Sequence, residues 1–174
     1  MAKFIVEGGH RLKGEIVPQG AKNEALQIIC AALLTPERVV LRNVPIIADV
    51  MQLLELLKKM GVKVERQGDD VFTLQADEID LEYLRTADYH KRCRRLRGSV
   101  MMIGPLLTRF GIGFMPKPGG DKIGRRRLDT HFLGFQKLGA DFNFDISDEF
   151  YTVEAKRLKA TWYAPCHQVT QHHR

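Results

Sequence analysis

The stretch AALLTPERVVLRNVP (residues 31–45) is followed later in the chain by GPLLTRFGIGFMPKP (residues 104–118), and the two can be laid over each other. LLKKMGVKVE (56–65) matches FQKLGADFNF (135–144) in the same way. The copies lie roughly 73 to 78 residues apart, which is the length of a whole subdomain rather than of a solenoid repeat. We therefore expect a fold made of two similar units.

The first unit is expected over residues 14–78 with the element order βαβαββ. Its predicted elements are a strand at 14–20, a helix at 21–34, a strand at 38–45, a helix at 47–61 and a hairpin of 62–68 with 71–76. The helix at 21–34 is apolar on nearly every face, which predicts burial on all sides.

The second unit is expected over residues 79–158 and repeats this order. It contains a buried helix at 94–111, a strand at 112–119, an amphipathic helix at 126–139 and a closing hairpin of 140–147 with 150–156. One unit leaves its sheet and a helix half covered, so the copies should pack around shared buried helices. The predicted class is α/β (α+β), built from βαβαββ subdomains.

The two ends of the chain fall outside this repeat. Residues 1–20 form an N-terminal strand segment, and residues 159–174 are expected to be an irregular tail in place of a third unit. The tail contains Cys166, His167, His172 and His173, but their spacing matches no common zinc pattern. We expect no metal site.

Composition indicates a water-soluble protein. The 174 residues are 44% hydrophobic and 28% charged, and no run of about 18 apolar residues predicts a membrane helix. The N-terminus lacks the apolar segment of a signal peptide. Three widely spaced cysteines argue against a disulfide framework, so we expect a cytoplasmic protein.

The formal net charge of +6 points to an anionic partner or merely to good solubility. Positive charge concentrates in KRCRRLR (91–97) and KIGRRR (122–127). Aromatic residues do not alternate with these basic residues as base stacking would require, so nucleic acid is the less favoured partner. Small ligands that carry phosphate fit the pattern equally well.

Two places are suited to hold such an anion. The segment KPGGDKIGRRRLDTH (117–131) joins conformationally free glycines to three consecutive arginines. Lys22 and Asn23 begin the first buried helix, where the helix dipole and free amides attract negative charge. A surface lysine followed by an asparagine cap is the alternative interpretation of that pair.

The repeat, GAKNEAL (20–26), LRGSVMMIGPLLTRFG (96–111) and PGGDKIGRRRLDTHFLGFQKLGA (118–140) together resemble one family closely. It is the UDP-N-acetylglucosamine 1-carboxyvinyltransferase family, within the EPSP-synthase-like enolpyruvyl transferases. The resemblance runs from about residue 3 to residue 158. It implies a partial inside-out α/β barrel and the transfer of enolpyruvyl from phosphoenolpyruvate to the 3′-hydroxyl of UDP-N-acetylglucosamine, without a metal or organic cofactor.

The resemblance also assigns roles to residues. Lys22 and Asn23 would contact phosphoenolpyruvate, Arg97 would contact the substrates, and Arg126 would lie in the ligand site at the end of a substrate loop (115–127). Around the uridine diphosphate the family places the residues that here are Arg127, Leu128, Asp129 and Thr130. Many relatives have proline where this chain has Arg127.

Some of these positions have a purely structural interpretation as well. Asp129 could be only a helix N-cap. His131 is interpreted as a supporting or packing residue rather than a catalyst. Arg92, Arg94 and Arg95 have no counterpart in the family motif and are interpreted as a solvated basic face.

Asp121 stands where many family members carry a cysteine, described as the acid that protonates C3 of phosphoenolpyruvate and as the nucleophile alkylated by fosfomycin. An aspartate can donate that proton only if its pKa rises from about 4. A carboxylate is also a poorer nucleophile than a thiolate. We therefore expect Asp121 to be the catalytic acid and the loop to be insensitive to fosfomycin.

The resemblance further implies a third unit in the same domain and a second domain that faces it across the active site. The second domain would supply the base for the sugar hydroxyl, so we expect negligible turnover from this chain alone. Two alternatives stay open at this point: a non-catalytic module that binds a UDP-sugar or phosphate, and a basic nucleic-acid-binding protein.

Overall fold

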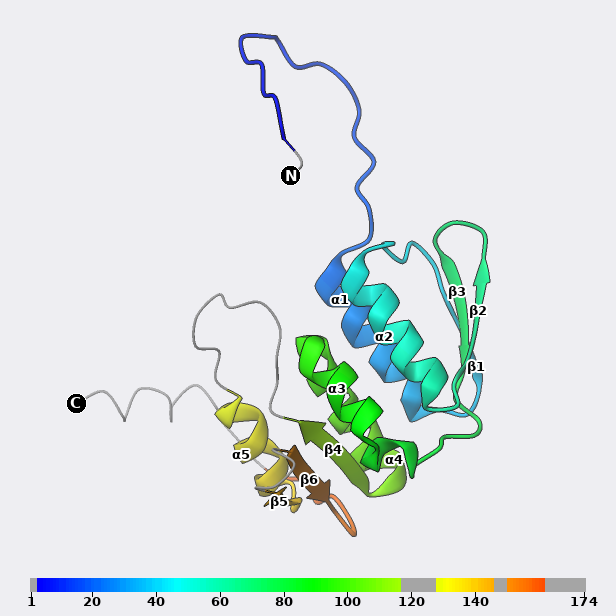
Figure 1. Ribbon diagram of the computed structural model, residues 1–174, viewed down its shortest axis with the longest axis vertical. Helices are drawn as coiled ribbons and strands as arrows, with labels where there is room; N and C mark the ends of the chain where they lie inside the picture. The colour runs from blue at the N-terminus through cyan, green and yellow to red at the C-terminus, as the bar shows by residue number, and fades with distance from the viewer. Residues whose placement is uncertain (1–2, 117–127, 146–149, 162–174) are drawn as a thin grey trace, which may run out of the picture.

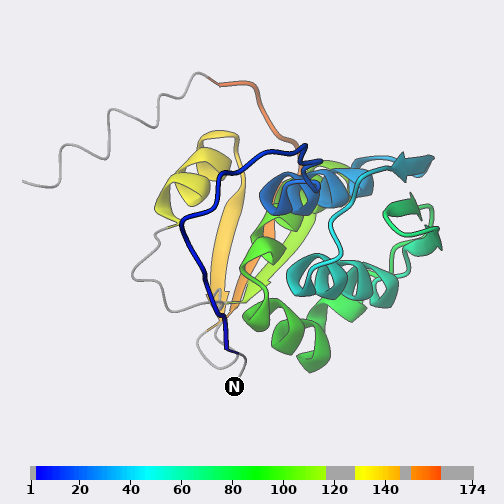
Figure 2. The same cartoon turned by 90° about the horizontal axis from the view of Figure 1, so that it is seen from above.

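The computed structural model describes residues 3–116, 128–145 and 150–161. These residues form two units that lie against each other (Figure 1). In the view from above, the helices of the first unit lie on one side and α5 with the second sheet lies on the other (Figure 2).

The first unit combines two helices with a three-stranded sheet. Its elements are α1 (Lys22–Ala31), the 3-10 turn η1 (Ala32–Leu34), β1 (Arg38–Leu41), α2 (Ala48–Lys59), β2 (Lys63–Gln67) and β3 (Val71–Gln75). The first helical segment stops at Thr35, which is extended because a residue that precedes proline disfavours helical backbone. The apolar side of α2 is fully buried between α1 and β2, which fixes this helix in the unit.

The second unit has the same order, with one α-helix and two 3-10 segments placed before it. Its elements are η2 (Tyr83–Arg85), α3 (Ala87–Arg95), η3 (Arg97–Met102), α4 (Ile103–Phe110), β4 (Ile112–Pro116), α5 (Asp129–Lys137), β5 (Asp141–Asp145) and β6 (Phe150–Glu154). The helix α4 ends at Gly111, whose φ of 74° is left-handed and whose amide donates to the carbonyl of Leu107.

The two sheets confirm the predicted repeat. Each is antiparallel and places the last strand of its unit in the centre, in the orders β1-β3-β2 and β4-β6-β5. The registers are equivalent, since Arg38 lies opposite Gln75 in one sheet and Ile112 lies opposite Glu154 in the other.

The units share one hydrophobic core, as expected of copies that pack around buried helices. The helix α1 packs on η3, and η1 packs on α4. Arg109 of α4 joins the units further, because its guanidinium donates to the carbonyls of Leu33 at 3.1 Å and Ala76 at 2.6 Å. A smaller apolar cluster lies between α4, α5 and β6.

The predicted strand at 14–20 is wrong. Residues 3–19 are exposed and form an arm that leaves the body at α1 (Figures 1 and 2). A strand is stable only when a neighbouring strand pairs with its backbone, and this arm lies away from both sheets. Each unit, as far as the structure describes it, therefore follows αβαββ without the expected first strand.

The single helix predicted over 94–111 is also wrong, because the chain breaks at Leu96. Leu96 has extended backbone and a buried side chain, and η3 and α4 follow it as separate segments. Gly98 and Ser99 favour this break because both are weak helix formers. The preceding helix α3 was not anticipated from the sequence.

The prediction that the first helix is buried on all sides is wrong as well. Leu26, Ile29 and Cys30 are buried, but Ile28 is 42% exposed and Leu34 of η1 is 50% exposed. The reason is that α2 and the η3–α4 segment cover α1 and η1 from only one side.

The beginning of the predicted tail has no helix or strand over 159–161. The amide of Lys159 donates to the carbonyl of Leu138 at 2.8 Å, which attaches this end to α5. Residues 162–174, including the four cysteine and histidine positions considered for a metal, lie outside the described residues.

Candidate functional site

The N-terminus of α1 carries the predicted residues Lys22 and Asn23. The N-cap is Ala21, which has no side-chain cap, so the interpretation of Asn23 as a cap is wrong. Asn23 is instead the second helical residue and is exposed. Lys22 forms an ion pair through Nζ with Oδ2 of Asp49, in the first turn of α2. This end of the molecule therefore presents uncapped helix amides beside an ammonium group.

Arg97 is brought to α1 by the close approach of η3. A Cβ atom on Gly98 would lie 3.1 Å from Cδ1 of Leu26, so only glycine allows this spacing without displacing the leucine. The next residue, Ser99, is buried and donates through Oγ to the carbonyl of Cys93 at 3.3 Å. Arg97, at the start of η3, is thus held next to the helix that carries Lys22 and Asn23.

The start of α5 holds Leu128, Asp129 and Thr130. Leu128 is 8% exposed, and its side chain belongs to the smaller apolar cluster with Val100 of η3. Only the backbone of Leu128 is therefore placed to meet a ligand. Asp129 is the first helical residue, and the N-cap is Leu128, so the N-cap interpretation of Asp129 is wrong. His131 is exposed and belongs to neither apolar cluster, so a packing role in the core is wrong for this residue.

The remaining predicted residues belong to the substrate loop. Asp121, Arg126 and Arg127 lie outside the described residues. The described chain fixes only the two ends of this loop, which are Pro116 at the end of β4 and Leu128 before α5.

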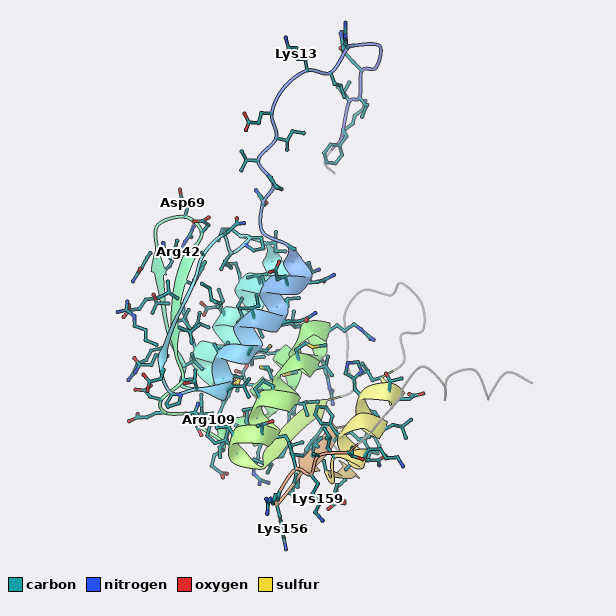
Figure 3. The ribbon with its side chains drawn as sticks, turned by 180° about the vertical axis from the view of Figure 1, so that it is seen from behind. Lys13, Arg42, Asp69, Arg109, Lys156 and Lys159 are labelled. Carbon is teal, nitrogen blue, oxygen red and sulfur yellow. The ribbon has the colours of Figure 1, made fainter. Side chains whose placement is uncertain are left out.

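A groove beside α1 was not found from the sequence. It is lined by Gly20, Ala21, Glu24, Ala25 and Ile28 on one side and by Leu41, Arg42, Asn43 and Val44 on the other. Figure 3 labels Arg42, which follows β1 at this groove. The walls approach so closely that a Cβ on Gly20 would overlap the carbonyl oxygen of Asn43. The backbone of Asn43 is left-handed, with φ at 56°. With one carboxylate and one guanidinium, the groove suits a doubly anionic ligand less well than Lys22 and Arg97 do.

The basic segment 91–97 divides into two environments. Arg94 and Arg95 are exposed, as a solvated basic face requires. The side chain of Arg92 is 40% exposed, so it belongs to the solvated face as well, but its Nε donates to Oδ2 of Asp88 at 2.8 Å. The hydrogen bond from Arg92, together with one from the Tyr83 hydroxyl, lowers the pKa of Asp88.

Within the described residues, no group of three or more histidine, cysteine or carboxylate side chains is gathered as a metal site would require. In the same residues, no helix has the length and apolar character needed to span a membrane.

Residues 6–164 match the model of a protein family described as EPSP synthase (3-phosphoshikimate 1-carboxyvinyltransferase). Over 162 residues the chain is 56% identical to the UDP-N-acetylglucosamine 1-carboxyvinyltransferase of Bacteroides thetaiotaomicron, covering 93% of this chain and 37% of that protein. The enzyme of the same name from Porphyromonas gingivalis is 53% identical, again over 93% of this chain. The chain thus spans little more than a third of the length of these curated relatives.

Two solved structures share the fold. The enolpyruvyl transferase NikO from Streptomyces tendae superposes with a TM-score of 0.68 at 24% identity, covering 87% of this chain and 32% of that one. EPSP synthase from Acinetobacter baumannii gives a TM-score of 0.56 at 14% identity, over 86% of this chain and 34% of that one. At these identities the likeness concerns the fold alone.

Proposed function

Because the chain belongs to the EPSP synthase (3-phosphoshikimate 1-carboxyvinyltransferase) family, we propose that it forms one wall of an enolpyruvyl transfer site. The donor is phosphoenolpyruvate and the acceptor is the 3′-hydroxyl of UDP-N-acetylglucosamine. The proposal of this acceptor rests on the 53–56% identity to enzymes named for that substrate. The reaction is a step of peptidoglycan synthesis and takes place in the cytoplasm.

The chemistry requires a site that holds two anionic groups. Phosphoenolpyruvate carries a carboxylate and a phosphate, and cationic character develops at C2 when C3 is protonated. Lys22 and Arg97 supply two cations on neighbouring elements, and the uncapped amides at the start of α1 supply further donors. Asn23 contributes from the first turn of the same helix.

The transfer proceeds by addition and then elimination. In the addition, the sugar hydroxyl gives its proton to a base outside this wall and its oxygen bonds to C2, while C3 takes a proton from Asp121, which gives a tetrahedral phospho-ketal. In the elimination, the C2–O bond to phosphate breaks and a C3 proton passes to the Asp121 carboxylate, which restores the double bond and releases inorganic phosphate. Arg126 binds an anionic substrate group, and Arg127, Leu128, Asp129 and Thr130 surround the uridine diphosphate.

The experiment is a binding titration on the chain itself. Phosphoenolpyruvate and UDP-N-acetylglucosamine are titrated separately and together, with heat release and thermal unfolding as readouts. Saturable binding that weakens at least tenfold in Lys22→Met and Arg97→Met is the expected result. Lys58→Met is the matched control, because Lys58 is an exposed lysine that pairs with Glu55 on α2. Unaltered binding in both site variants would refute the assignment.

Turnover is a separate question. Activity requires groups beyond this wall, so phosphate release from both substrates should be negligible for the chain alone. A full-length relative measured in parallel provides the positive control. Release by the chain at a rate ordinary for an enzyme would show that the wall is sufficient by itself.

We also propose that the site resists fosfomycin, because Asp121 stands where a cysteine would be alkylated. The measurement is intact-mass spectrometry after exposure to the drug, with Asp121→Cys as the matched comparison. The variant should gain the mass of the drug while the unaltered chain does not. A stable adduct on Asp121 would overturn this proposal.

A further inference from the structure

The arm at residues 3–19 exposes its apolar side chains to solvent. Its six large apolar residues are 79–94% exposed, whereas the next most exposed one among the described residues, Leu34, is 50% exposed. Within the same residues, no backbone hydrogen bond joins the arm to the body. An exposed apolar segment of this kind is typical of an interaction site. The six residues are Phe4, Ile5, Val6, Leu12, Ile16 and Val17.

The strand β1 has a free edge that is suited to accept another strand. In the order β1-β3-β2, the strands β1 and β2 are the outer ones, but their composition differs. Three of the five residues of β2 are charged, which is a common protection of a sheet edge against pairing. The strand β1 is apolar after Arg38 and exposes Val40 by 45%. It is therefore the edge of this sheet at which an extended segment can be added.

The groove beside α1 provides a place for one side chain of an added strand. Its volume is about 130 Å³, and its apolar lining includes Ala25, Ile28 and Leu41. A cavity of about 150 Å³ with aliphatic walls accepts benzene, so this groove is large enough for a single aliphatic side chain. Residues directly opposite each other on antiparallel strands point to the same face of the sheet. A residue paired with Leu41 would therefore point toward the groove.

One stretch of the arm matches this edge when it runs antiparallel to β1. In this register Ile16 lies opposite Leu41, where its side chain fills the groove. Val17 lies opposite Val40 and covers that exposed side chain on the other face. Both pairs join branched or aliphatic residues, which stabilise a sheet when they face each other. Pro18 follows and ends the added strand because it has no amide to donate.

The charges match in the same register. Glu15 lies opposite Arg42, the residue that follows β1. Two other acids are near this position, since Glu24 of α1 lines the same groove and the carbonyl of Asp70 accepts from the amide of Val44. Within the described residues, neither of these acids forms an ion pair with Arg42. A carboxylate directly opposite Arg42 therefore adds a favourable cross-strand pair.

We propose that the chain pairs with a second copy of itself, and that the arm of each copy adds residues 15–17 as a strand to the β1 edge of the other copy. The arm of the same chain is not the occupant, because it leaves the body at Gly20 and lies away from both sheets (Figures 1 and 2). Figure 3 shows the arm around Lys13 well away from Arg42 of the same chain. Each copy offers one arm and one edge, so reciprocal exchange closes a two-fold dimer. This inference is independent of the proposed function.

The test measures the oligomeric state of the chain by sedimentation velocity over about a hundredfold range of concentration. The unaltered chain should pass from monomer to dimer within this range. Ile16→Lys combined with Val17→Lys should weaken dimerisation at least about tenfold, because lysines at a sheet edge oppose pairing. Ile5→Lys combined with Val6→Lys is the matched control, since it changes the same residue types in the same arm outside the register. It should stay within about twofold of the unaltered chain.

Two changes on the edge itself test the register. Val40→Lys should weaken dimerisation at least about tenfold, with the melting temperature confirming that this variant folds. Glu15→Arg and Arg42→Glu should each weaken it about threefold at low salt, because like charges then lie opposite each other. Combined in one chain, the two reversals should restore the affinity to within about twofold, because the pair is again of opposite charge.

Each contrary result has a distinct meaning. A monomer at every concentration would overturn the proposal. Equal weakening by the two arm variants would overturn the register, because the apolar arms would then associate without it. Amide protection of residues 15–17 in hydrogen exchange at concentrations where the chain is monomeric would assign the arm to its own body and overturn pairing between copies. Assemblies that grow beyond two copies would overturn the reciprocal exchange.

Discussion

The helices α2 and α5 occupy equivalent places in the two units but are held very differently. Five residues of α2 are fully buried, whereas no residue of α5 is, and α5 reaches the smaller cluster mainly through half-buried Phe132 and Phe135. Equal strand order and register therefore do not require equal burial. The helix α5, which follows the proposed substrate loop, is the more weakly held of the two helices, and local opening costs least where packing is weakest.

The outer edges of the two sheets differ in a related way. On β4, the carbonyl of Phe114 accepts a hydrogen bond from Tyr89, and the guanidinium of Arg85 lies 5.0 Å from the centre of the Phe114 ring. On β1, Val40 is 45% exposed, and the arm that precedes α1 leaves the body. In the second unit, the segment that contains η2 and α3 thus covers the outer strand β4. In the first unit, the arm before α1 leaves the outer strand β1 open.

The largest predicted effect is on the pH dependence of stability, through two buried thiols, one in each unit. Burial raises the pKa of Cys30 on α1 and of Cys93 on α3 to about 12. Both thiols stay protonated in the folded chain while they ionise near pH 9 when unfolded, so stability is complete below pH 9 and is lost as pH rises toward 12. The free energy of unfolding should fall by roughly 1.4 kcal/mol per pH unit for each thiol in that window.

Urea unfolding between pH 8 and 10, below the range in which unfolded tyrosines ionise, measures this slope. Cys30→Ala should reduce the slope by about half, although it lowers stability at pH 8 as well. A pH-independent free energy of unfolding over this range would contradict the burial of both thiols.

Leucine truncations test the difference between α2 and α5. Leu57→Ala should cost about 3 kcal/mol, because Leu57 is 0% exposed and its removal leaves a cavity. Leu133→Ala should cost about 1 kcal/mol at most, because Leu133 of α5 is already 38% exposed. Equal losses in chemical denaturation would show that the two units are held alike.

Arg109 tests how far the units depend on each other. Arg109→Met should lower the free energy of unfolding by about 2 kcal/mol, because the carbonyls of Leu33 and Ala76 lose a charged donor. Arg66→Met is the matched control, since Arg66 donates to two carbonyls of its own exposed turn. Calorimetry should show a clearly lower melting temperature only for Arg109→Met. A smaller loss for Arg109→Met than for the control would disprove the bridging role.

Tyr89→Phe tests the closed edge of the second sheet. The expected loss is about 1 kcal/mol, because the carbonyl of Phe114 loses a buried donor. Burial raises the pKa of Tyr89 well above 10, so this hydroxyl keeps its proton and remains a donor at neutral pH. Hydrogen exchange should quicken in β4 and β6 but not in β1. Tyr83→Phe, which removes an exposed bond to Asp88, is the control and should change these amides little.

The repeat, both hairpins and α2 were predictable because their apolar periods and turn residues are local signals. The break at Leu96 was missed: Gly98 and Ser99 only weaken a helix locally, and the close packing of Gly98 on Leu26, far away in sequence, is a tertiary feature. The prediction of a strand at 14–20 is wrong because composition there favours a strand, whereas pairing with a neighbouring strand is a tertiary property. Lys22 and Arg97 are assigned to the proposed site by the family motif alone, whereas Asp49, which pairs with Lys22, carries no sequence signal.

Substitution of Asp49, the ion-pair partner of Lys22, gives the smallest predicted effect on stability. It is also the sharpest test of what the first unit contributes to the proposed site. The Lys22–Asp49 pair is nearly half-exposed, so Asp49→Asn should change the free energy of unfolding by no more than about 0.5 kcal/mol, as should Glu55→Gln on the same helix. Their effects on ligand binding should differ. Asp49→Asn frees the ammonium of Lys22 and removes a negative charge from the candidate site, so phosphoenolpyruvate should bind about two- to threefold more tightly at low salt, whereas Glu55→Gln should leave its affinity unchanged. Weaker binding in Asp49→Asn would mean that the ion pair positions Lys22 for the ligand rather than competing with it. The first unit would then supply an oriented cation, and its rigidity, not only its charge, would matter to the site.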